Sequence, residues 1–146
     1  MCLDTIKSTM SSTSVVIVFG VFDRFHAGHQ DFLRQVRECR YERIICVVAP
    51  DSIVVRFKKK QPWQTAEERI ATLNRHGHEA IIGDEEPGTY SALKQIQPTG
   101  ICFGADQIPL KDHITELMHQ GILPFARLHV MVDTMPHLHT SVLYPG

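Results

Sequence analysis

The chain has 146 residues, of which 43% are hydrophobic and 21% are charged. These values are ordinary for a globular protein and exclude the disordered and fibrous classes. The formal net charge of −1 argues against general nucleic-acid binding, and the sequence contains no apolar run of about 18 residues that would span a membrane.

The first half of the chain alternates buried strands with an amphipathic helix. Residues 1–14 lack the apolar core of a signal peptide and are expected to form a frayed leader. Ser14–Phe19 and Arg43–Ala49 are rich in β-branched residues and predict buried strands. Between them, Gly28–Arg40 has the apolar spacing of a helix.

The next segment predicts two helices separated by a polar loop. Residues 51–57 indicate a short helix, and residues 58–63 a loop. Thr65 and Glu68 have the spacing of a capping box, which predicts a helix that fades at His76.

Shorter elements complete the chain. We expect strands at 79–82, 99–103 and 125–132, helices at 90–96 and around 114–118, and a possible helical turn from Thr140. This alternation predicts one α/β domain over residues 1–146, a Rossmann-like, doubly wound, five-stranded parallel sheet with helices on both faces. Ligands of such folds bind beyond the carboxyl ends of the strands, so the loops after Phe19, Ala49 and Phe103 are the candidate site.

The loop after the first strand, Gly20–His29, has the character of a phosphate site. A helix that begins at its end offers free backbone N–H groups and a partial positive charge. Gly20 and Gly28 allow close approach of a ligand to the backbone. His26 and His29 are three residues apart, which places both imidazoles on one face of the helix start, where both can donate to one phosphate group.

This segment reads G-x-F-D-x-x-H-x-G-H and resembles the signature of the cytidylyltransferase-like nucleotidyltransferases. The resemblance implies that the two histidines, His26 and His29, act in catalysis at the α-phosphate and that Asp23 lies near the substrate phosphate or a metal. It also implies nucleotide binding by Gly20, Val21, Phe22 and Gly28.

Weaker motifs follow in the family's order. Residues 56–63 resemble the family's basic loop, in which Lys58 is a candidate catalytic residue and Lys60 a candidate nucleotide ligand. Arg69, in Glu67-Glu68-Arg69, is expected near the nucleotide phosphates, the alternative being an ion pair with Glu67 or Glu68.

The last two motifs lie in the second half of the chain. Phe103–Gln107 is similar to the G-x-D-Q of archaeal-type FAD synthases and implies nucleotide contacts from Gly104 and Asp106. His139-Thr140-Ser141 resembles the terminal S-T-S, so Thr140 and Ser141 are expected to hold phosphates.

The resemblance implies transfer of AMP or CMP from ATP or CTP, with Mg²⁺, to a phosphate monoester, with release of pyrophosphate. FAD-synthase-like transfer from ATP to FMN is favoured. The alternatives are a glycerol-3-phosphate-type cytidylyltransferase, a pantetheine-phosphate adenylyltransferase and a non-catalytic nucleotide-binding module. Only the absence of a basic residue after Ser141 favours the last of these.

Cellular context follows from composition and from the family. The four cysteines form no C-x-x-C pair and are expected to be reduced thiols, which points to the cytoplasm. We expect neither a nucleic-acid nor a membrane partner, and the family suggests a homodimer.

Overall fold

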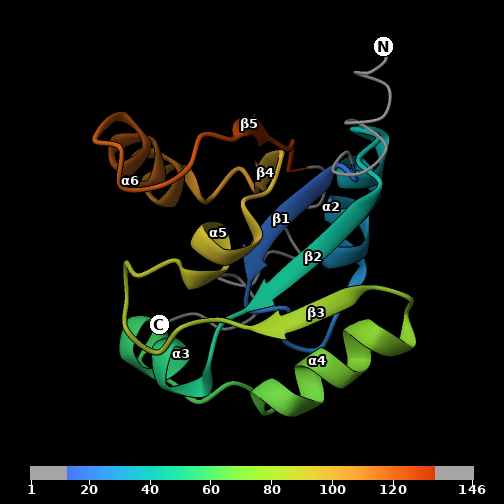
Figure 1. Ribbon diagram of the computed structural model, residues 1–146. Coiled ribbons are helices and arrows are strands. Elements are labelled where there is room, and N and C mark those ends of the chain that lie inside the picture. Colours follow the sequence, from blue (N-terminus) through green and yellow to red (C-terminus); the bar gives the residue numbers. More distant parts are fainter. Residues whose placement is uncertain (1–12, 134–146) are drawn as a thin grey trace.

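A computed structural model describes residues 13–133, and its centre is one parallel sheet of five strands (Figure 1). The strand order is β3-β2-β1-β4-β5, and all four neighbouring pairs are parallel. The strands are β1 (Val15–Gly20), β2 (Arg43–Val48), β3 (Glu79–Ile82), β4 (Gly100–Phe103) and β5 (Arg127–Val130).

Five helices connect these strands within the described range. They are α2 (Ala27–Glu38), α3 (Asp51–Lys58), α4 (Ala66–Arg75), α5 (Ser91–Ile96) and α6 (Ile108–His119). No helix in residues 13–133 is long and apolar enough to cross a membrane.

The alternating residues of each strand build two cores, one on each face of the sheet. Val16 and Val18 of β1 pack with apolar residues of α2 and α4, including Leu33 and Leu73. Ile17 faces the other way and packs with residues of α5 and α6. Every residue of β4 is buried, as expected for a strand covered on both faces. This is the doubly wound α/β architecture predicted from the sequence.

The structure adjusts several of the predicted element boundaries. The helix predicted at 51–57 extends to Lys58 and ends on Lys59 in the left-handed conformation. The short helix around 114–118 is a twelve-residue helix, α6. The last strand covers only Arg127–Val130 of the predicted 125–132, and Phe125 lies before it with 84% of its surface exposed.

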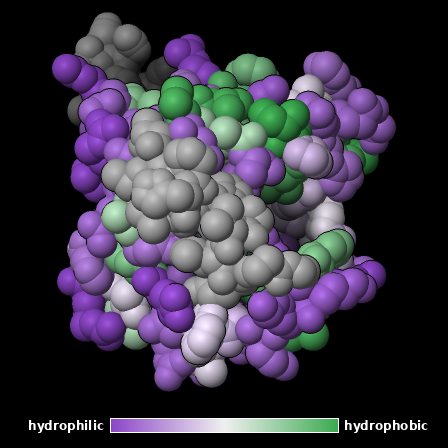
Figure 2. All heavy atoms as spheres, turned by 180° about the vertical axis from the view of Figure 1, so that it is seen from behind, coloured by the Kyte–Doolittle hydropathy of each residue, from purple (hydrophilic) through white to green (hydrophobic). Residues whose placement is uncertain are grey.

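Hydrophilic and hydrophobic side chains are unevenly distributed over the surface. Among the residues that Figure 2 colours, hydrophilic ones predominate on the rear face, and hydrophobic ones gather toward its upper edge. The most exposed large hydrophobic side chains include Phe125 and Val132, next to β5, and Trp63 and Phe57, near the carboxyl edge of the sheet.

The order of the strands creates a crevice for a ligand at one edge of the sheet. The chain passes from β1 to β2 and β3 on one side, then returns to β4 on the other side of β1. The crossover leaves a crevice between the carboxyl ends of β1 and β4, where ligands bind in open α/β sheets. In Figure 1 the arrowheads of β1 to β3 point toward the side on which α3 lies.

Candidate nucleotide-binding site

A cavity of about 500 Å³ opens at this carboxyl edge. Its walls come from the ends of β1, β2 and β4, the start of α2, helix α3, the β3–α5 loop and residues 131–133. Eight of the residues expected at a nucleotide site line it: Gly20, Val21, Phe22, Gly28, His29, Lys58, Gly104 and Asp106. Thr140 and Ser141 lie outside the described residues.

The two histidines form the amino-terminal cap of α2. The Nδ1 atom of His26 accepts the N–H of Gly28 at 3.0 Å, and the Nδ1 atom of His29 accepts the N–H of His26 at 3.2 Å. The rings stack with centroids 3.8 Å apart. Because each Nδ1 atom is an acceptor, each neutral ring carries its proton on Nε2. The cap thus leaves Nε2–H as the donor of each ring at a helix amino terminus, a position that favours a phosphate. His29 lines the cavity, whereas His26 is not among the lining residues and its Nε2 atom is buried.

Gly20 makes room for a side chain of its own loop. A Cβ atom on Gly20 would lie 2.8 Å from the Phe22 ring. Phe22 is almost fully buried and has a left-handed backbone with φ +55°. The glycine therefore lets the chain turn back over itself, in addition to any approach of a nucleotide.

Asp23 is directed into the protein. It is 1% exposed, and its carboxylate accepts the backbone N–H groups of Trp63 at 2.7 Å and Gln64 at 3.0 Å. The neighbouring residues Phe22 and Arg24 both have positive φ, a conformation that is costly for non-glycine residues. The acceptor bonds of Asp23 hold this turn against the α3–α4 loop, and its expected place near the substrate phosphate or a metal stays a prediction.

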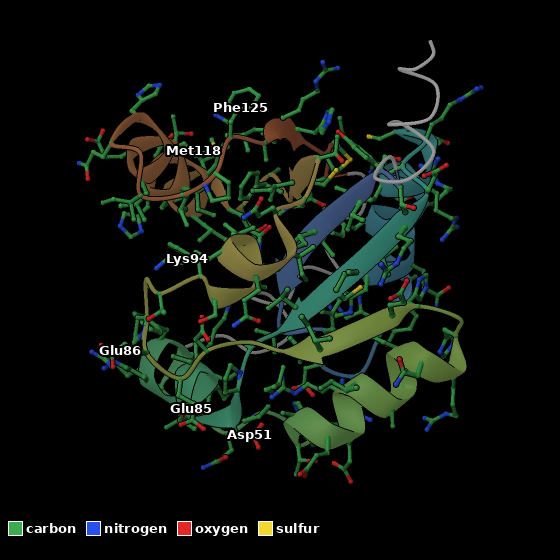
Figure 3. The ribbon with its side chains drawn as sticks, in the orientation of Figure 1. Asp51, Glu85, Glu86, Lys94, Met118 and Phe125 are labelled. Atoms are coloured by element: carbon green, nitrogen blue, oxygen red, sulfur yellow. The ribbon has the colours of Figure 1, made fainter. Side chains whose placement is uncertain are left out.

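Arg69 has partners that differ from both expectations. It is fully buried, and its guanidinium donates to the carbonyl oxygens of Val21, Ala49 and Gln64 at 3.0, 2.8 and 3.1 Å. It also pairs with Asp51 Oδ1 at 2.6 Å, not with Glu67 or Glu68. Asp51 lies between α3 and α4 in Figure 3. Arg69 thus joins the loops after β1 and β2 to the start of α4, and it does not line the cavity.

The two lysines differ in position. Lys58, at the carboxyl end of α3, lines the main cavity and is half-buried. Lys60 is exposed and lines a smaller pocket beside it, together with Val21 and Asp23. Lys58 is therefore the lysine that shares the main cavity with the start of α2, and Lys60 is not among its lining residues.

Gln107 joins the two strands of the crevice, a role that the sequence did not reveal. Its Oε1 atom accepts the N–H of Gly104 at 2.8 Å, and its Nε2 atom donates to the carbonyl of Phe19 at 2.9 Å. A Cβ atom on Gly104 would lie 2.9 Å from Asp106 Oδ1, so glycine here accommodates the aspartate. The G-x-D-Q pattern marked this loop, but only the fold reveals that its glutamine spans β1 and β4.

Gln35 fixes another wall of the cavity. Its amide donates to the carbonyl of Val132 at 2.8 Å and accepts the N–H of the same residue at 3.0 Å. It also donates to Asp31, which lines the cavity with Val132 and Asp133. This pairing across 97 residues had no signal in the sequence, where Gln35 reads as a surface position of a helix.

Charges in the lining are unevenly distributed. Asp84 and Glu86 lie on the β3–α5 wall and Asp106 follows β4, whereas Lys58 stands on the α3 wall near Val21. Asp31 on α2 also lines the cavity, and its carboxylate is paired with Arg34 at 2.9 Å. An anionic group is therefore favoured between Lys58 and the α2 cap and disfavoured near the β3–α5 loop. Burial raises the pKa of Tyr90, so its hydroxyl stays neutral.

Comparison with known proteins agrees with the geometry. The cytidylyltransferase-like family matches residues 17–141. The chain is 36% identical to an FAD synthase of Pyrococcus horikoshii over 127 residues, 85% of this chain and 81% of that protein. It is 40% identical to an FAD synthase of Thermococcus kodakarensis over 134 residues, 86% of this chain and 82% of that protein.

A solved structure shares the fold. The lipopolysaccharide core biosynthesis protein from Thermoplasma volcanium has a TM-score of 0.68 with 23% identity, covering 84% of this chain and 98% of that one. The architecture, the paired imidazole cap and the matched residues agree. The chain is a nucleotidyltransferase that belongs to the cytidylyltransferase-like family.

Proposed function

We propose that the protein is an FAD synthase, which transfers the adenylyl group of ATP to FMN and releases pyrophosphate. The observation that carries the proposal is the similarity to FAD synthases over more than four fifths of both chains, together with the paired imidazole cap of α2, of which His29 lines the cavity. FMN is a phosphate monoester, so its phosphate oxygen is already anionic near neutral pH and requires no general base.

In this reaction a phosphate oxygen of FMN attacks the α-phosphorus of ATP, and the bond from that phosphorus to the pyrophosphate oxygen breaks. Catalysis then depends on placement and on neutralising charge. Nε2–H of His26 and of His29 would donate to the phosphate oxygens, with the backbone N–H groups at the start of α2. Lys58 would neutralise the leaving pyrophosphate or the incoming phosphate.

Other predicted contacts belong to the same proposal. Gly104 and Asp106, at the end of β4, would contact the nucleoside in the crevice. Lys60, Thr140 and Ser141 would add donors to the triphosphate. Asp23 and Arg69 act as positioning residues, because their polar atoms hold the loops that surround the cavity.

Magnesium fits this donor set as a companion of the nucleotide. Within residues 13–133 no three His, Cys, Asp or Glu side chains are grouped to hold a metal ion. Mg²⁺ is often held by one or two carboxylates, phosphate oxygens and water, so a protein cage is not required. Asp106 would supply a carboxylate, and the metal would neutralise phosphate charge when bound.

Cellular location and assembly remain proposals. We propose a cytoplasmic enzyme, consistent with three free cysteines, of which Cys46 and Cys102 are buried. Burial raises the pKa of Cys46 to about 12, which keeps this thiol protonated and unreactive. Cys2 lies outside the described residues. A homodimer stays a prediction from the family.

The decisive experiment offers the purified protein Mg-ATP or Mg-CTP with FMN, glycerol-3-phosphate or pantetheine phosphate. Products are separated by chromatography, and pyrophosphate is measured independently. We expect FAD and equimolar pyrophosphate only with ATP and FMN. Pyrophosphate release from CTP with glycerol-3-phosphate, without FAD from ATP and FMN, would assign the cytidylyltransferase instead. No turnover with any pair would indicate the non-catalytic module.

A further inference from the structure

We infer that Phe57, on α3, binds the ring system of the acceptor and selects a planar aromatic acceptor over a small phosphorylated alcohol. The inference rests on the proposed transfer to FMN and assigns the acceptor to one half of the cavity. It is carried by an exposed aromatic side chain in the cavity wall, by the wall that faces it and by the distribution of charge.

Helix α3 presents an apolar stripe to the cavity. Pro50, Ile53 and Phe57 are spaced at i, i+3 and i+7, so they share one face of the helix, and all three line the cavity. Val54 points elsewhere and is buried in contact with the protein. Phe57 remains 62% exposed although it belongs to the cavity wall. An aromatic ring left open at a cavity is suited to cover a ligand.

The β3–α5 loop forms the wall beside this stripe. Pro87, Gly88 and Tyr90 line the cavity there. Tyr90 is held by its hydroxyl, 2.8 Å from His113 Nδ1, and by an edge contact with the Phe19 ring. A hydrogen bond of 3.1 Å from Ser52 Oγ to Glu85 Oε1 ties the loop to α3. In Figure 3 Glu85 and Glu86 lie beside α3.

The position of the α3 stripe in the fold assigns this half of the cavity to the acceptor. The nucleoside of a doubly wound fold binds at the switch point, here between β1 and β4, with its phosphates at the start of α2. The α3 stripe follows β2 and lies against the segment after β3, on the side of β1 away from β4. The part of the cavity that the nucleotide leaves open is therefore bounded by Phe57 and the β3–α5 loop.

Charge then orients the acceptor. Asp84 and Glu86 lie on the β3–α5 wall, and Lys58 lies next to Phe57 on the side of Val21. The carboxylates repel a phosphate, whereas Lys58 attracts it toward the α2 cap. An acceptor with a phosphate at one end and an uncharged ring at the other fits this order, with its ring against Phe57. Arg56 lies over the same ring at 5.6 Å from its centroid.

The test compares Phe57→Ala and Phe57→Tyr with wild type, and Phe125→Ala serves as the control. Phe125 is 84% exposed, does not line the cavity and lies beside β5, far from α3 in Figure 3. Binding of FMN is titrated without ATP, and KM for FMN and for ATP are measured separately. We expect Phe57→Ala to weaken FMN binding and raise its KM by about 5- to 150-fold, the range for loss of one stacking contact.

The same variants separate a binding role from a structural one. KM for ATP and the thermal midpoint should be unchanged in Phe57→Ala, Phe57→Tyr should restore FMN affinity, and Phe125→Ala should match wild type. In Phe57→Trp, flavin fluorescence should be quenched on binding more strongly than in wild type, because an indole stacked on a flavin quenches it.

The outcomes distinguish this inference from the proposed function. If wild type forms FAD while Phe57→Ala keeps the wild-type affinity and KM for FMN, the inference is overturned and the function stands. An equal rise in KM for ATP and FMN also overturns it. If wild type forms no FAD but binds FMN in a Phe57-dependent way, the inference stands and the function fails. Absence of FMN binding together with absence of FAD formation overturns both.

Discussion

His26 and His29 build the start of α2, and the proposed reaction gives the same pair a chemical role. A helix usually begins with Ser, Thr, Asp or Asn, whose oxygen accepts a backbone N–H. In α2 two imidazole nitrogens fill that role, and the arrangement closes a capping box made of histidines. The accepting nitrogen of each ring is used by the backbone, so the opposite nitrogen is left with the proton.

This double role can be separated by substitution. His26→Asn replaces the Nδ1 acceptor with an amide oxygen, which is a good cap, but removes the Nε2–H donor. We expect turnover to fall by roughly 10²–10³, as for loss of an oxyanion donor, with little change in stability. His26→Ala should lose the same turnover and in addition about 1 kcal/mol of unfolding free energy. Steady-state kinetics and urea unfolding measure the two effects.

A contrary result would be informative. If folded His26→Asn retained near-native turnover, the imidazole would serve only as a cap. His29→Ala provides the matching measurement on the second ring, with the same expected loss of turnover.

At the residue scale, local spacing predicts which side chains lie together better than what each contacts. The proximity of His26, Gly28 and His29 follows from local spacing, whereas the presence of Lys58 in the cavity that His29 lines follows from the fold. The resemblance implied that Arg69 lies near the nucleotide phosphates and Asp23 near the substrate phosphate or a metal, and in the structure both side chains bond to backbone groups of other segments. Whether a side chain points inward depends on carbonyls and amides that other segments bring to it, and the local sequence does not contain that information.

At the scale of elements, one buried guanidinium holds together the segments that surround the cavity. Arg69 on α4 bonds to carbonyls that follow β1 and β2 and to Asp51 at the start of α3. Asp23 holds the α3–α4 loop from the opposite side. The loops therefore form one connected unit, and this unit fixes the position of Lys58.

Arg69→Met should damage this unit severely. It removes the donors to three partly buried carbonyls and the partner of Asp51, at a cost of about 3 kcal/mol or more. We expect a lower urea midpoint and, in protein that remains folded, a raised KM for ATP. Arg69→Lys keeps the charge but cannot reach all of the same acceptors, so this variant should retain only part of the stability that Arg69→Met loses. If Arg69→Met were as stable as wild type yet inactive, Arg69 would contact the phosphates after all.

The turn between α4 and β3 gives a prediction on pH. Burial, then the positive charge of Arg37 and the neighbouring His76, lowers the pKa of His78 below its ordinary value of 6.5. The folded protein thus binds this proton less readily than the unfolded chain. The contribution of His78 to the free energy of unfolding is complete above about pH 6.5. It is lost as the pH falls toward the lowered pKa of this side chain.

We therefore expect the thermal midpoint to fall between pH 7.5 and pH 5.5 by more in wild type than in His78→Gln, which cannot titrate. Other groups titrate equally in both proteins and cancel in the comparison. Equal falls in the two proteins would show that the environment of His78 does not differ between folded and unfolded states.

At the scale of the whole molecule, the sequence predicted the fold closely because its signals are local and repeated. Runs of β-branched residues in β1 and β2 and the helical spacing of α2 and α4 each specify an element, and their alternation specifies a parallel sheet. The last strand was less predictable, since β5 is short and partly exposed. It is followed by Val132, which is hydrogen-bonded to Gln35. The links made by Gln35 and Gln107 join segments 97 and 88 residues apart, which no local pattern encodes.

The nucleotide preference is also a property of the assembled molecule, and thermal stability reports it without knowledge of the acceptor. A ligand at about 100 times its dissociation constant stabilises the folded state by roughly 2.7 kcal/mol, or roughly 5–10 °C for a chain of this size. We expect such a shift with Mg-ATP and a much smaller one with Mg-CTP, because the proposed donor is ATP. His26→Asn combined with His29→Ala should abolish it. Equal shifts with both nucleotides would remove the preference for ATP. No shift with either, even after FMN is added, would leave the cap without a triphosphate to bind and contradict the proposed reaction.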